Sequence, residues 1–274
     1  RLGSARAMAD IELSDHRLQA TGFGELGGFS PFGQEGDVGD CFYNWTTEEL
    51  ASWFGLTSEP LTLREWRRRG FAIGSIYDDD LGTFDVPGED EVLYPCICGI
   101  SMGWSWSLYF ANESVAYKVA KTSDEGGADA LRERSPAPDV RPGRSITGTY
   151  VDNVQSIGGN SADAVARMKA ITSSFVDDQI PFDITDPGSS TELQTLGVVY
   201  HWDERCLRQV PRRAWRAHLA GRALLRRRRL HGRTLQIWMG HMVNLFQLNP
   251  ECLSVFSALY RFQEHALYRP QRVW

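Results

Sequence analysis

The second half of the chain carries the clearest pattern of hydrophobic and polar positions. Ser161 can cap a helix, and the residues that would share one face of this helix are Val165, Met168, Thr172 and Phe175. Three more helices are expected after residue 210, at about 211–230, about 234–248, and from Asn249-Pro250 onward. At the last of these a capping residue precedes a proline in the first helical position. The pattern therefore predicts an all-helical C-terminal part.

The first 200 residues show mostly short β-like runs separated by turn residues. A short strand is expected to run from Glu35 into a turn near Tyr43, and residues 92–100 are apolar and rich in β-forming side chains. Residues 146–157 predict a β-hairpin with Asp152-Asn153 near its tip, because both residue types tolerate the positive φ that a tight turn needs. A further short strand is expected at 193–199.

Helices and loops are expected between these strands. Thr46-Thr47-Glu48-Glu49 is a Thr-x-x-Glu capping box and predicts a short helix that buries Leu50, Trp53 and Phe54. Residues 57–92 predict hairpins and loops, a helix should end near Lys121, and 122–144 predict an exposed loop rich in Gly, Pro and charge. The first part is therefore expected to be mixed α/β.

Composition narrows the class of protein. The hydrophobic fraction of 42% is ordinary for a globular chain, and no run of about 20 apolar residues predicts a membrane span. The N-terminus has no apolar segment typical of a secretory signal, and five scattered cysteines favour a reducing compartment. The protein is expected to be intracellular and without a membrane partner. Because the first residue is Arg1, we also expect a piece of a longer polyprotein.

The net charge of −6 conceals an asymmetry along the chain. Residues 201–274 hold 14 Arg, no Lys and four acids, so this part carries +10 and the rest −16. Carboxylates in the first part could hold cations, while arginines in the last part could hold a polyanion. If charge is considered alone, this asymmetry is better explained by a simple segregation of charged residues on the surface.

Asp37, at the end of one predicted strand, and Asp152, at the tip of a hairpin, are candidate metal ligands. Nucleotide transfer uses two divalent cations that activate the primer 3′-hydroxyl and neutralise the phosphates. Hard cations prefer carboxylate oxygens, so a polymerase must bring acids from distant segments to one edge of a sheet. Either aspartate alone is weak evidence, because aspartate is common in turns.

Four segments, taken in order, together resemble the palm motifs of reverse transcriptases. Glu-Gly-Asp37-Val-Gly-Asp40-Cys-Phe42-Tyr resembles the first motif, and Ile-Ser-Met-Gly103-Trp-Ser-Trp resembles the second, which supports template and incoming nucleotide. Tyr150-Val-Asp152-Asn153 resembles the Tyr-x-Asp-Asp hairpin, and Leu196-Gly197 stands where the primer-grip Leu-Gly is expected. The resemblance covers about residues 31–274, and its specificity lies in order and spacing. It implies an RNA-directed DNA polymerase of a retrotransposon.

The resemblance implies a role for each matched position. Asp37, Asp152 and Asn153 would form the catalytic set, and Asp37, Asp152 and the Val38 carbonyl would bind two Mg²⁺ or Mn²⁺ ions. The positions implied to bind the deoxynucleoside triphosphate are Asp40, Phe42, Met102, Gly103 and Trp104. Phe42 would exclude a 2′-hydroxyl, although core packing is the alternative for Phe42, Met102 and Trp104. Tyr150, Leu196 and Gly197 would contact the primer.

The C-terminal arginines are candidates for contact with an RNA/DNA template–primer duplex. Arg212, Arg216 and Arg226 could track the phosphate backbone, and such contacts carry no base readout, so binding should tolerate any sequence. For Arg226 to Arg229 the alternatives are a localisation signal and a solvated helix face.

The chain departs from the family pattern at three places. Asn153 stands where the family has a second aspartate; it keeps one oxygen ligand but loses a charge, so metal affinity should fall. No lysine follows Lys169 to protonate pyrophosphate, and residues 1–30 show no clear basic pair for the triphosphate. Tyr77-Asp78-Asp79-Asp80 looks like a catalytic hairpin but precedes the Met102-Gly103 motif, so a solvated turn explains it better.

The expected fold is α+β: a polymerase palm, with an antiparallel sheet backed by helices, has partial fingers and is followed by an α-helical thumb. The expected domains are 1–30 as partial fingers, 31–205 as palm with a finger-like insertion at about 57–92, and 206–274 as thumb. Two alternatives stay open. One is a catalytically impaired, nucleic-acid-binding relative, and the other is an RNA-templated RNA polymerase, against which Phe42 argues.

Overall fold

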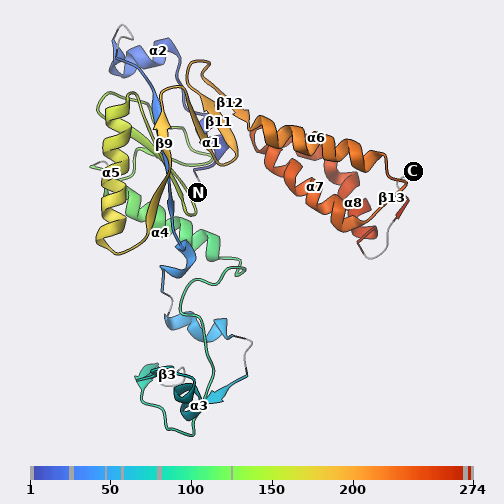
Figure 1. The fold of residues 1–274 in the computed structure, drawn as a ribbon. Helices are drawn as coiled ribbons and strands as arrows, with labels where there is room; N and C mark the ends of the chain where they lie inside the picture. The colour runs from blue at the N-terminus through green and yellow to red at the C-terminus, as the bar shows by residue number, and fades with distance from the viewer. Residues whose placement is uncertain are drawn as a thin grey trace. The chain divides into compact units, whose positions relative to one another are not determined.

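The computed structural model describes residues 3–24, 28–46, 48–56, 59–78, 82–124, 126–267 and 271–272. The chain divides into two compact units, and each is described by itself (Figure 1). Unit 1 comprises residues 1–39 and 114–274, and unit 2 comprises residues 40–113. The fold is mixed α/β.

A five-stranded sheet in the order β6-β7-β8-β1-β9 forms the centre of unit 1. Its strands are β1 (Phe32–Val38), β6 (Ala130–Leu131), β7 (Ser145–Tyr150), β8 (Asn153–Gly158) and β9 (Phe182–Ser189). The strand β1 runs antiparallel to both β8 and β9, and β7 and β8 form the predicted hairpin. The edge strand β6 is parallel to β7, so the sheet is mixed rather than purely antiparallel.

Helix α5 (Ser161–Asp177) packs against one face of this sheet (Figure 1). Its N-cap is Asn160 rather than Ser161, because the Asn160 side chain accepts a hydrogen bond from the Asp163 N–H at 2.9 Å. The buried residues, spaced three and four apart as a helical face requires, are Ala164, Met168, Ile171 and Phe175. Val165 was predicted on this face but is 43% exposed, so the predicted face was wrong at that position.

A second sheet in unit 1 consists of β10 (Glu192–Thr195), β11 (Val198–His201) and β12 (Cys206–Gln209), all antiparallel. The single strand expected at 193–199 was therefore wrong, because Leu196-Gly197 turns the chain back on itself.

Short N-terminal helices pack against the two sheets of unit 1. They are α1 (Ala5–Ala9), α2 (Asp15–Leu18) and a π-helical turn at Gln19–Phe23. Met8 and Leu18 share one hydrophobic cluster with Ile146, Ile157 and Leu193. Leu131 and Val140 join the same cluster, so residues 122–144 are not the fully exposed loop that their composition predicted.

The C-terminal part of unit 1 is mainly helical, as predicted, but it also contains two short paired strands, and the helix expected from Asn249-Pro250 begins as a 3₁₀ turn. This part contains α6 (Pro211–Leu225), α7 (Gly232–Leu245), 3₁₀ turns at Phe246–Leu248 and Pro250–Phe256, α8 (Ser257–His265), and the paired strands β13 (Arg229–Leu230) and β14 (Gln271–Arg272). A small core of Leu230, Leu235, Met239 and Phe256 holds it together. The first helix ends at Leu225 and not near 230, so Arg226 to Arg229 lie outside it. Within the described ranges no helix is long and apolar enough to cross a membrane.

Unit 2 is built from short elements. They are 3₁₀ turns at Cys41–Tyr43 and Glu48–Phe54, β2 (Leu61–Thr62), α3 (Leu63–Arg68), β3 (Ile76–Asp78), β4 (Thr83–Asp85), β5 (Val92–Leu93) and the start of α4 (Ser107–Lys121). The sequence predicted α4, and it predicted hairpins and loops at 57–92 but not α3.

Three details of unit 2 differ from the predictions or fall outside the description. Trp53 is 79% exposed, so the helix expected to bury it is instead a 3₁₀ turn that leaves it in solvent. The β-prone run at 92–100 pairs only through β5 and isolated bridges at Cys96 and Gly99. Asp79 and Asp80, from the Tyr-Asp-Asp-Asp segment, and Thr47, from the predicted capping box, lie outside the described residues.

Candidate functional site

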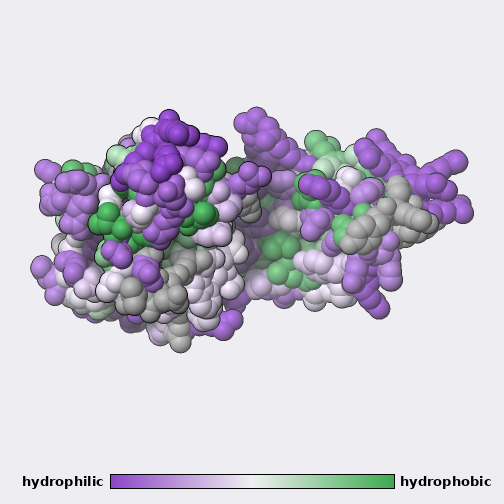
Figure 2. All heavy atoms as spheres, turned by 90° about the horizontal axis from the view of Figure 1, so that it is seen from below, coloured by the Kyte–Doolittle hydropathy of each residue, from purple (hydrophilic) through white to green (hydrophobic). Residues whose placement is uncertain are grey.

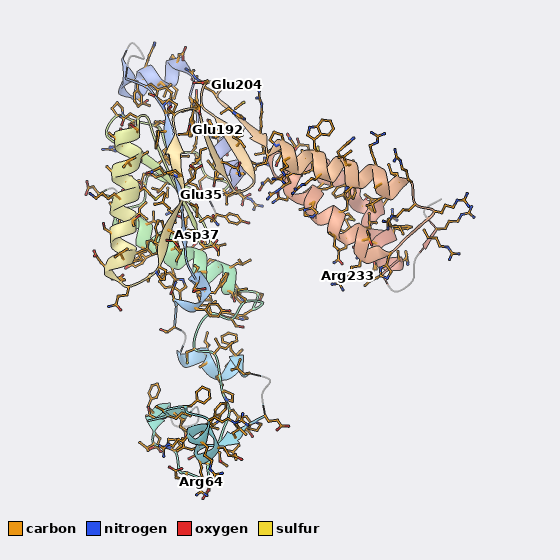
Figure 3. The ribbon with its side chains drawn as sticks, in the orientation of Figure 1. Glu35, Asp37, Arg64, Glu192, Glu204 and Arg233 are labelled. Carbon is orange, nitrogen blue, oxygen red and sulfur yellow. The ribbon has the colours of Figure 1, made fainter. Side chains whose placement is uncertain are left out.

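Asp37 lies near the end of β1, between the two neighbouring strands of the sheet. Its cross-strand partner on β8 is Asn153, and its partner on β9 is Asp183. Because side chains alternate along a strand, Glu35 and Asp37 share one face of β1, where both are labelled in Figure 3. Asp183 was not among the predicted site residues, and its position depends on the long-range pairing of β9 with β1.

The β7–β8 hairpin carries Asp152 to the same end of β1. Tyr150 pairs with Asn153, which leaves Val151 and Asp152 as the two turn residues. Val151 adopts φ +59°, a strained value for a β-branched residue, so the prediction that Asp152 or Asn153 takes the positive φ was wrong. The Val38 N–H donates to the Asp152 carbonyl at 2.9 Å and so fixes the turn beside β1.

The pKa of Asp37 is raised above its ordinary value at this sheet end. Burial is the largest cause, and the negative charges of Asp152 and Asp183 add to it. The Asn153 amide donates to the Asp152 Oδ1 atom at 2.9 Å. Among the described residues, no group of three or more His, Cys, Asp or Glu is placed to hold a metal ion. This end of the sheet therefore carries Asp37 and Asp152, together with the Asn153 amide and the Asp183 carboxylate.

Glu35, two residues before Asp37, lies in a buried polar network beneath this site. Its Oε1 atom accepts hydrogen bonds from the Thr195 hydroxyl at 2.6 Å and from the Gln155 amide at 3.2 Å. Burial raises the pKa of Glu35, while these hydrogen bonds partly oppose the rise. The network links β1, β8 and β10, and so connects the carboxylate end of the first sheet to the second sheet.

The Leu196-Gly197 turn is held by the C-terminal helices. Both residues have positive φ, +49° and +82°, as a two-residue hairpin turn of type I′ requires. The Gln247 amide donates to the Leu196 carbonyl at 2.9 Å. A Cβ atom on Gly197 would come within 2.2 Å of the Arg213 Nη1 atom, which itself donates to the Asn244 Oδ1 atom at 2.7 Å. The turn is therefore fixed against α6 and the segment that follows α7.

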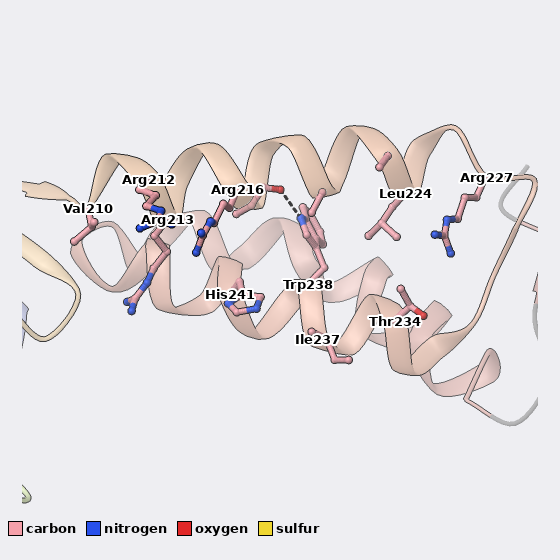
Figure 4. A pocket seen from close by; sticks show the side chains of 13 residues that line it. Val210, Arg212, Arg213, Arg216, Leu224, Arg227, Thr234, Ile237, Trp238 and His241 are labelled. Atoms are coloured by element: carbon pink, nitrogen blue, oxygen red, sulfur yellow. Dashed lines mark hydrogen bonds between the residues drawn. The ribbon is translucent and has the colours of Figure 1, made fainter.

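A basic groove of about 720 Å³ runs between α6 and α7 (Figure 4). Four arginines line it, namely Arg212, Arg213, Arg216 and Arg227, and its apolar lining includes Ala217, Leu224, Ile237 and Trp238. The Trp238 indole N–H donates to the Ala217 carbonyl at 2.8 Å, which fixes the ring in the groove. Figure 2 shows hydrophobic and hydrophilic residues side by side on the C-terminal helical part of the chain. The predicted Arg212 and Arg216 line this groove, whereas Arg226 is exposed just beyond α6.

The residues predicted to bind the nucleotide belong to unit 2. Asp40 has φ +51° and begins a 3₁₀ turn through Phe42, whose carbonyl accepts a hydrogen bond from the Ile100 N–H at 3.0 Å. The part of the first motif from Asp40 onward therefore lies beside the start of the second motif within unit 2. Gly103 has φ +103°, and Met102 is 64% exposed, so core packing does not explain Met102.

Trp104 belongs to an aromatic cluster in the same unit. Its ring stacks on Phe110 at 5.5 Å between centroids and meets the edge of Phe54 at 5.4 Å. Because Trp104 is only half-buried, packing explains part of its surface and leaves part of it in solvent.

No protein-family model and no curated protein matches the chain. Among solved structures, it is similar to a telomerase from Candida albicans in complex with a TWJ fragment of telomeric RNA. The identity is 9%, the TM-score is 0.37, and the match covers 95% of this chain and 45% of the telomerase chain. The chain thus spans less than half of that protein, and the similarity is too weak to assign a family or a function.

Proposed function

We propose that the chain is the polymerase core of a retroelement reverse transcriptase, which synthesises DNA on an RNA template. One observation carries the proposal. Asp37 and Asp152 come from distant parts of the sequence, yet the hydrogen bond from the Val38 N–H to the Asp152 carbonyl brings their backbones together at one sheet end. Burial chiefly raises the pKa of Asp37 there, and the negative charge of Asp152 adds to the rise.

The oxygen atoms at this sheet end are of the chemical kind that divalent cations prefer. Asp37, Asp152 and the Val38 carbonyl would hold them, and the Asn153 amide oxygen is a further hard ligand. Burial chiefly, together with the charges of Asp152 and Asp183, raises the pKa of Asp37, and a bound cation would favour its ionised form. When bound, the ions would activate the primer 3′-hydroxyl and neutralise the triphosphate.

The protein's own side chains would position the two nucleic-acid strands and the nucleotide. Tyr150 is 37% exposed beside the catalytic hairpin, so it is accessible to the primer end. The Leu196-Gly197 turn, fixed by Gln247, would hold the primer strand in place. The arginines of the α6–α7 groove would bind phosphates, and the apolar lining would pack against sugars.

The second candidate function is a nucleic-acid-binding protein that makes no product. Asn153 favours it, since the hairpin has one carboxylate where the resemblance implies two. A metal site with one charge fewer binds Mg²⁺ more weakly, whereas the basic groove is unaffected by position 153.

Primer extension on an RNA template with Mg²⁺ or Mn²⁺ tests both candidates. We expect activity in the natural chain to be lost in Asp152→Ala and retained in a control, Asp203→Asn, which changes an exposed surface acid. No activity in the natural chain but activity in Asn153→Asp would indicate a polymerase disabled at one ligand. A folded protein that stays inactive in every variant would contradict the polymerase proposal and favour the binding protein.

Substrate choice gives a separate test of Phe42. If its ring excludes the 2′-hydroxyl, Phe42→Ala should increase the incorporation of ribonucleotides relative to deoxynucleotides. An unchanged ratio in an active variant would assign Phe42 to packing against the segment around Ile100.

A further inference from the structure

A second groove, of about 530 Å³, runs between α6 and α7 and is lined mainly by apolar side chains. It shares Trp238 with the basic groove of Figure 4, but its other lining residues are different. The residues of α6 that line it are spaced as one face of a helix requires, and they are Ala214, His218, Gly221, Arg222 and Leu225. The apolar lining from α7 and the turn after it includes Met242, Leu245 and Phe246. The two grooves therefore lie on different faces of the helix pair.

Large apolar side chains at this apolar groove are open to solvent. Leu225, which lines the groove, is 65% exposed. Trp215 is also 65% exposed, and its ring lies edge-on to the ring of His218, with 5.7 Å between the centroids. Leu219, one helical turn after Trp215, is exposed as well. An exposed apolar patch beside an apolar groove is typical of a surface that binds another protein.

The charge of this helical segment is entirely positive. Residues 211–250 hold nine Arg and no Lys, Asp or Glu, so they carry +9. Arg222 brings one of these charges into the apolar groove. Surfaces that bind each other have complementary charge, so the partner should be acidic as well as apolar. A nucleic-acid backbone would match the charge, but it would leave the apolar lining uncovered.

Unit 2 has a surface of this kind. Residues 40–113 hold 13 acids and four Arg, so unit 2 carries −9, and no Lys or Arg occurs between residues 70 and 117. In the segment 83–94, exposed apolar side chains lie next to acids in the sequence. Phe84 and Val86 flank the exposed Asp85, and Tyr94 follows the exposed Glu91 by three residues. A second copy of the chain therefore carries the acidic and apolar surface that matches the groove.

We propose that the apolar α6–α7 groove binds the segment 83–94 of a second copy of this chain. Phe84, Val86 and Tyr94 of one copy would cover the apolar lining of the other, and Asp85 would lie near Arg222. Each copy carries both surfaces, so two copies can form the contact twice, once in each direction. Neither a metal nor a nucleic acid takes part in this contact, which is therefore independent of the proposed function.

Sedimentation velocity of the full chain, without nucleic acid, tests this contact. We expect the chain to associate as its concentration rises. The dissociation constant should increase about ten-fold between about 50 mM and about 500 mM NaCl, because salt screens the opposite charges. A chain that stays monomeric up to about 100 μM would overturn the proposal, and so would association that does not depend on salt.

Charge reversal locates the contact. Arg222→Glu and Asp85→Arg each place like charges opposite each other, so each variant alone should associate about ten-fold more weakly. In an equimolar mixture of the two variants, every groove meets an opposite charge on the other variant, so association should return to the natural level. Arg233→Glu reverses an exposed charge on α7 that lines neither groove, and it should leave association unchanged. Circular dichroism checks that each variant is folded.

The mixture gives the decisive outcome. If it associates no better than the separate variants, or if Arg233→Glu weakens association as much as Arg222→Glu does, the proposal is overturned. Leu225→Gln keeps every charge and removes an apolar contact at an exposed position, so it should weaken association about ten-fold even if a charge variant does not fold. Unchanged association of Leu225→Gln would also overturn the proposal.

Discussion

Replacing Asn153 with aspartate should make the stability of the protein depend on Mg²⁺. Asn153 lies opposite Asp37 in the β1–β8 pair, and its amide donates to the Asp152 Oδ1 atom at 2.9 Å. Aspartate at this position removes that hydrogen bond and places a like charge opposite Asp37. The pKa of Asp37 is already raised by burial and by the charges of Asp152 and Asp183. A further carboxylate at position 153 would therefore be repelled by the acids already present there.

The size of the effect follows from these two losses. Like charges directly opposite in an antiparallel pair cost about 0.2–1 kcal/mol, and a lost hydrogen bond costs about 1 kcal/mol. A total of about 1–2 kcal/mol lowers the Tm by about 2–8 °C for a protein of this size. Mg²⁺ at ten times its Kd should then return about 1.4 kcal/mol.

Thermal unfolding at neutral pH, followed while Mg²⁺ is added, measures this dependence. The matched control is Gln194→Glu, which adds a carboxylate at an exposed position of β10 whose cross-strand partner is the apolar Val199. We expect the Tm of Asn153→Asp to rise with Mg²⁺ more than that of the control. If both variants respond equally, position 153 does not face a cation site, and the reasoning from the sheet end is refuted.

Three further changes test other parts of unit 1. Gly197→Ala should destabilise the protein by about 1–2 kcal/mol in urea unfolding, because Gly197 has a φ of +82°. The control Gly240→Ala changes a glycine of α7 that has open space around it, and it should not destabilise the protein. Equal effects of the two substitutions would contradict the strain argument. Glu35→Gln should raise the urea midpoint at pH 8 but not near pH 4. Burial raises the pKa of Glu35 in the folded protein, so Glu35 stabilises the fold at low pH, and this stabilisation is lost as the pH rises through the folded pKa. A pH-independent difference would refute this. Neutralising Arg212 and Arg216 together should reduce the slope of log affinity for duplex against log salt by about 1.5–2, and an unchanged slope would make them a solvated face.

The sequence could predict the hairpin and its two strands because their pattern is local. Tyr150-Val-Asp152-Asn153 lies between two β-like runs, and the structure places the turn there. The sequence placed the tip of the hairpin at Asp152-Asn153, one residue later than the structure does. Pairing of Tyr150 with Asn153 makes Val151 and Asp152 the turn residues, and this register depends on the strands rather than on turn propensity.

Asp183 could not be found in this way, because its place next to Asp37 depends on a pairing between segments far apart in the chain. Its strand has an irregular pattern, in which Phe182 is buried while Ile184 is 41% exposed. The N-terminal residues were missed for the same reason. Met8 and Leu18 belong to a Gly-rich, weakly patterned segment, and they become core only because the sheets of unit 1 offer them a surface.

Exchanging the neighbours of Asp37 separates charge from hydrogen bonding at the site. The double variant Asn153→Asp with Asp183→Asn keeps one carboxylate and one amide opposite Asp37, but it moves the carboxylate from β9 to β8. Relief of the extra repulsion should recover the charge part of the metal-free loss, about 1–3 °C of Tm, compared with Asn153→Asp alone. The rise of Tm with Mg²⁺ should persist, because the hairpin carboxylates remain. A double variant as unstable as the single one would assign the whole loss to the missing hydrogen bond to Asp152, and the repulsion argument would then be wrong.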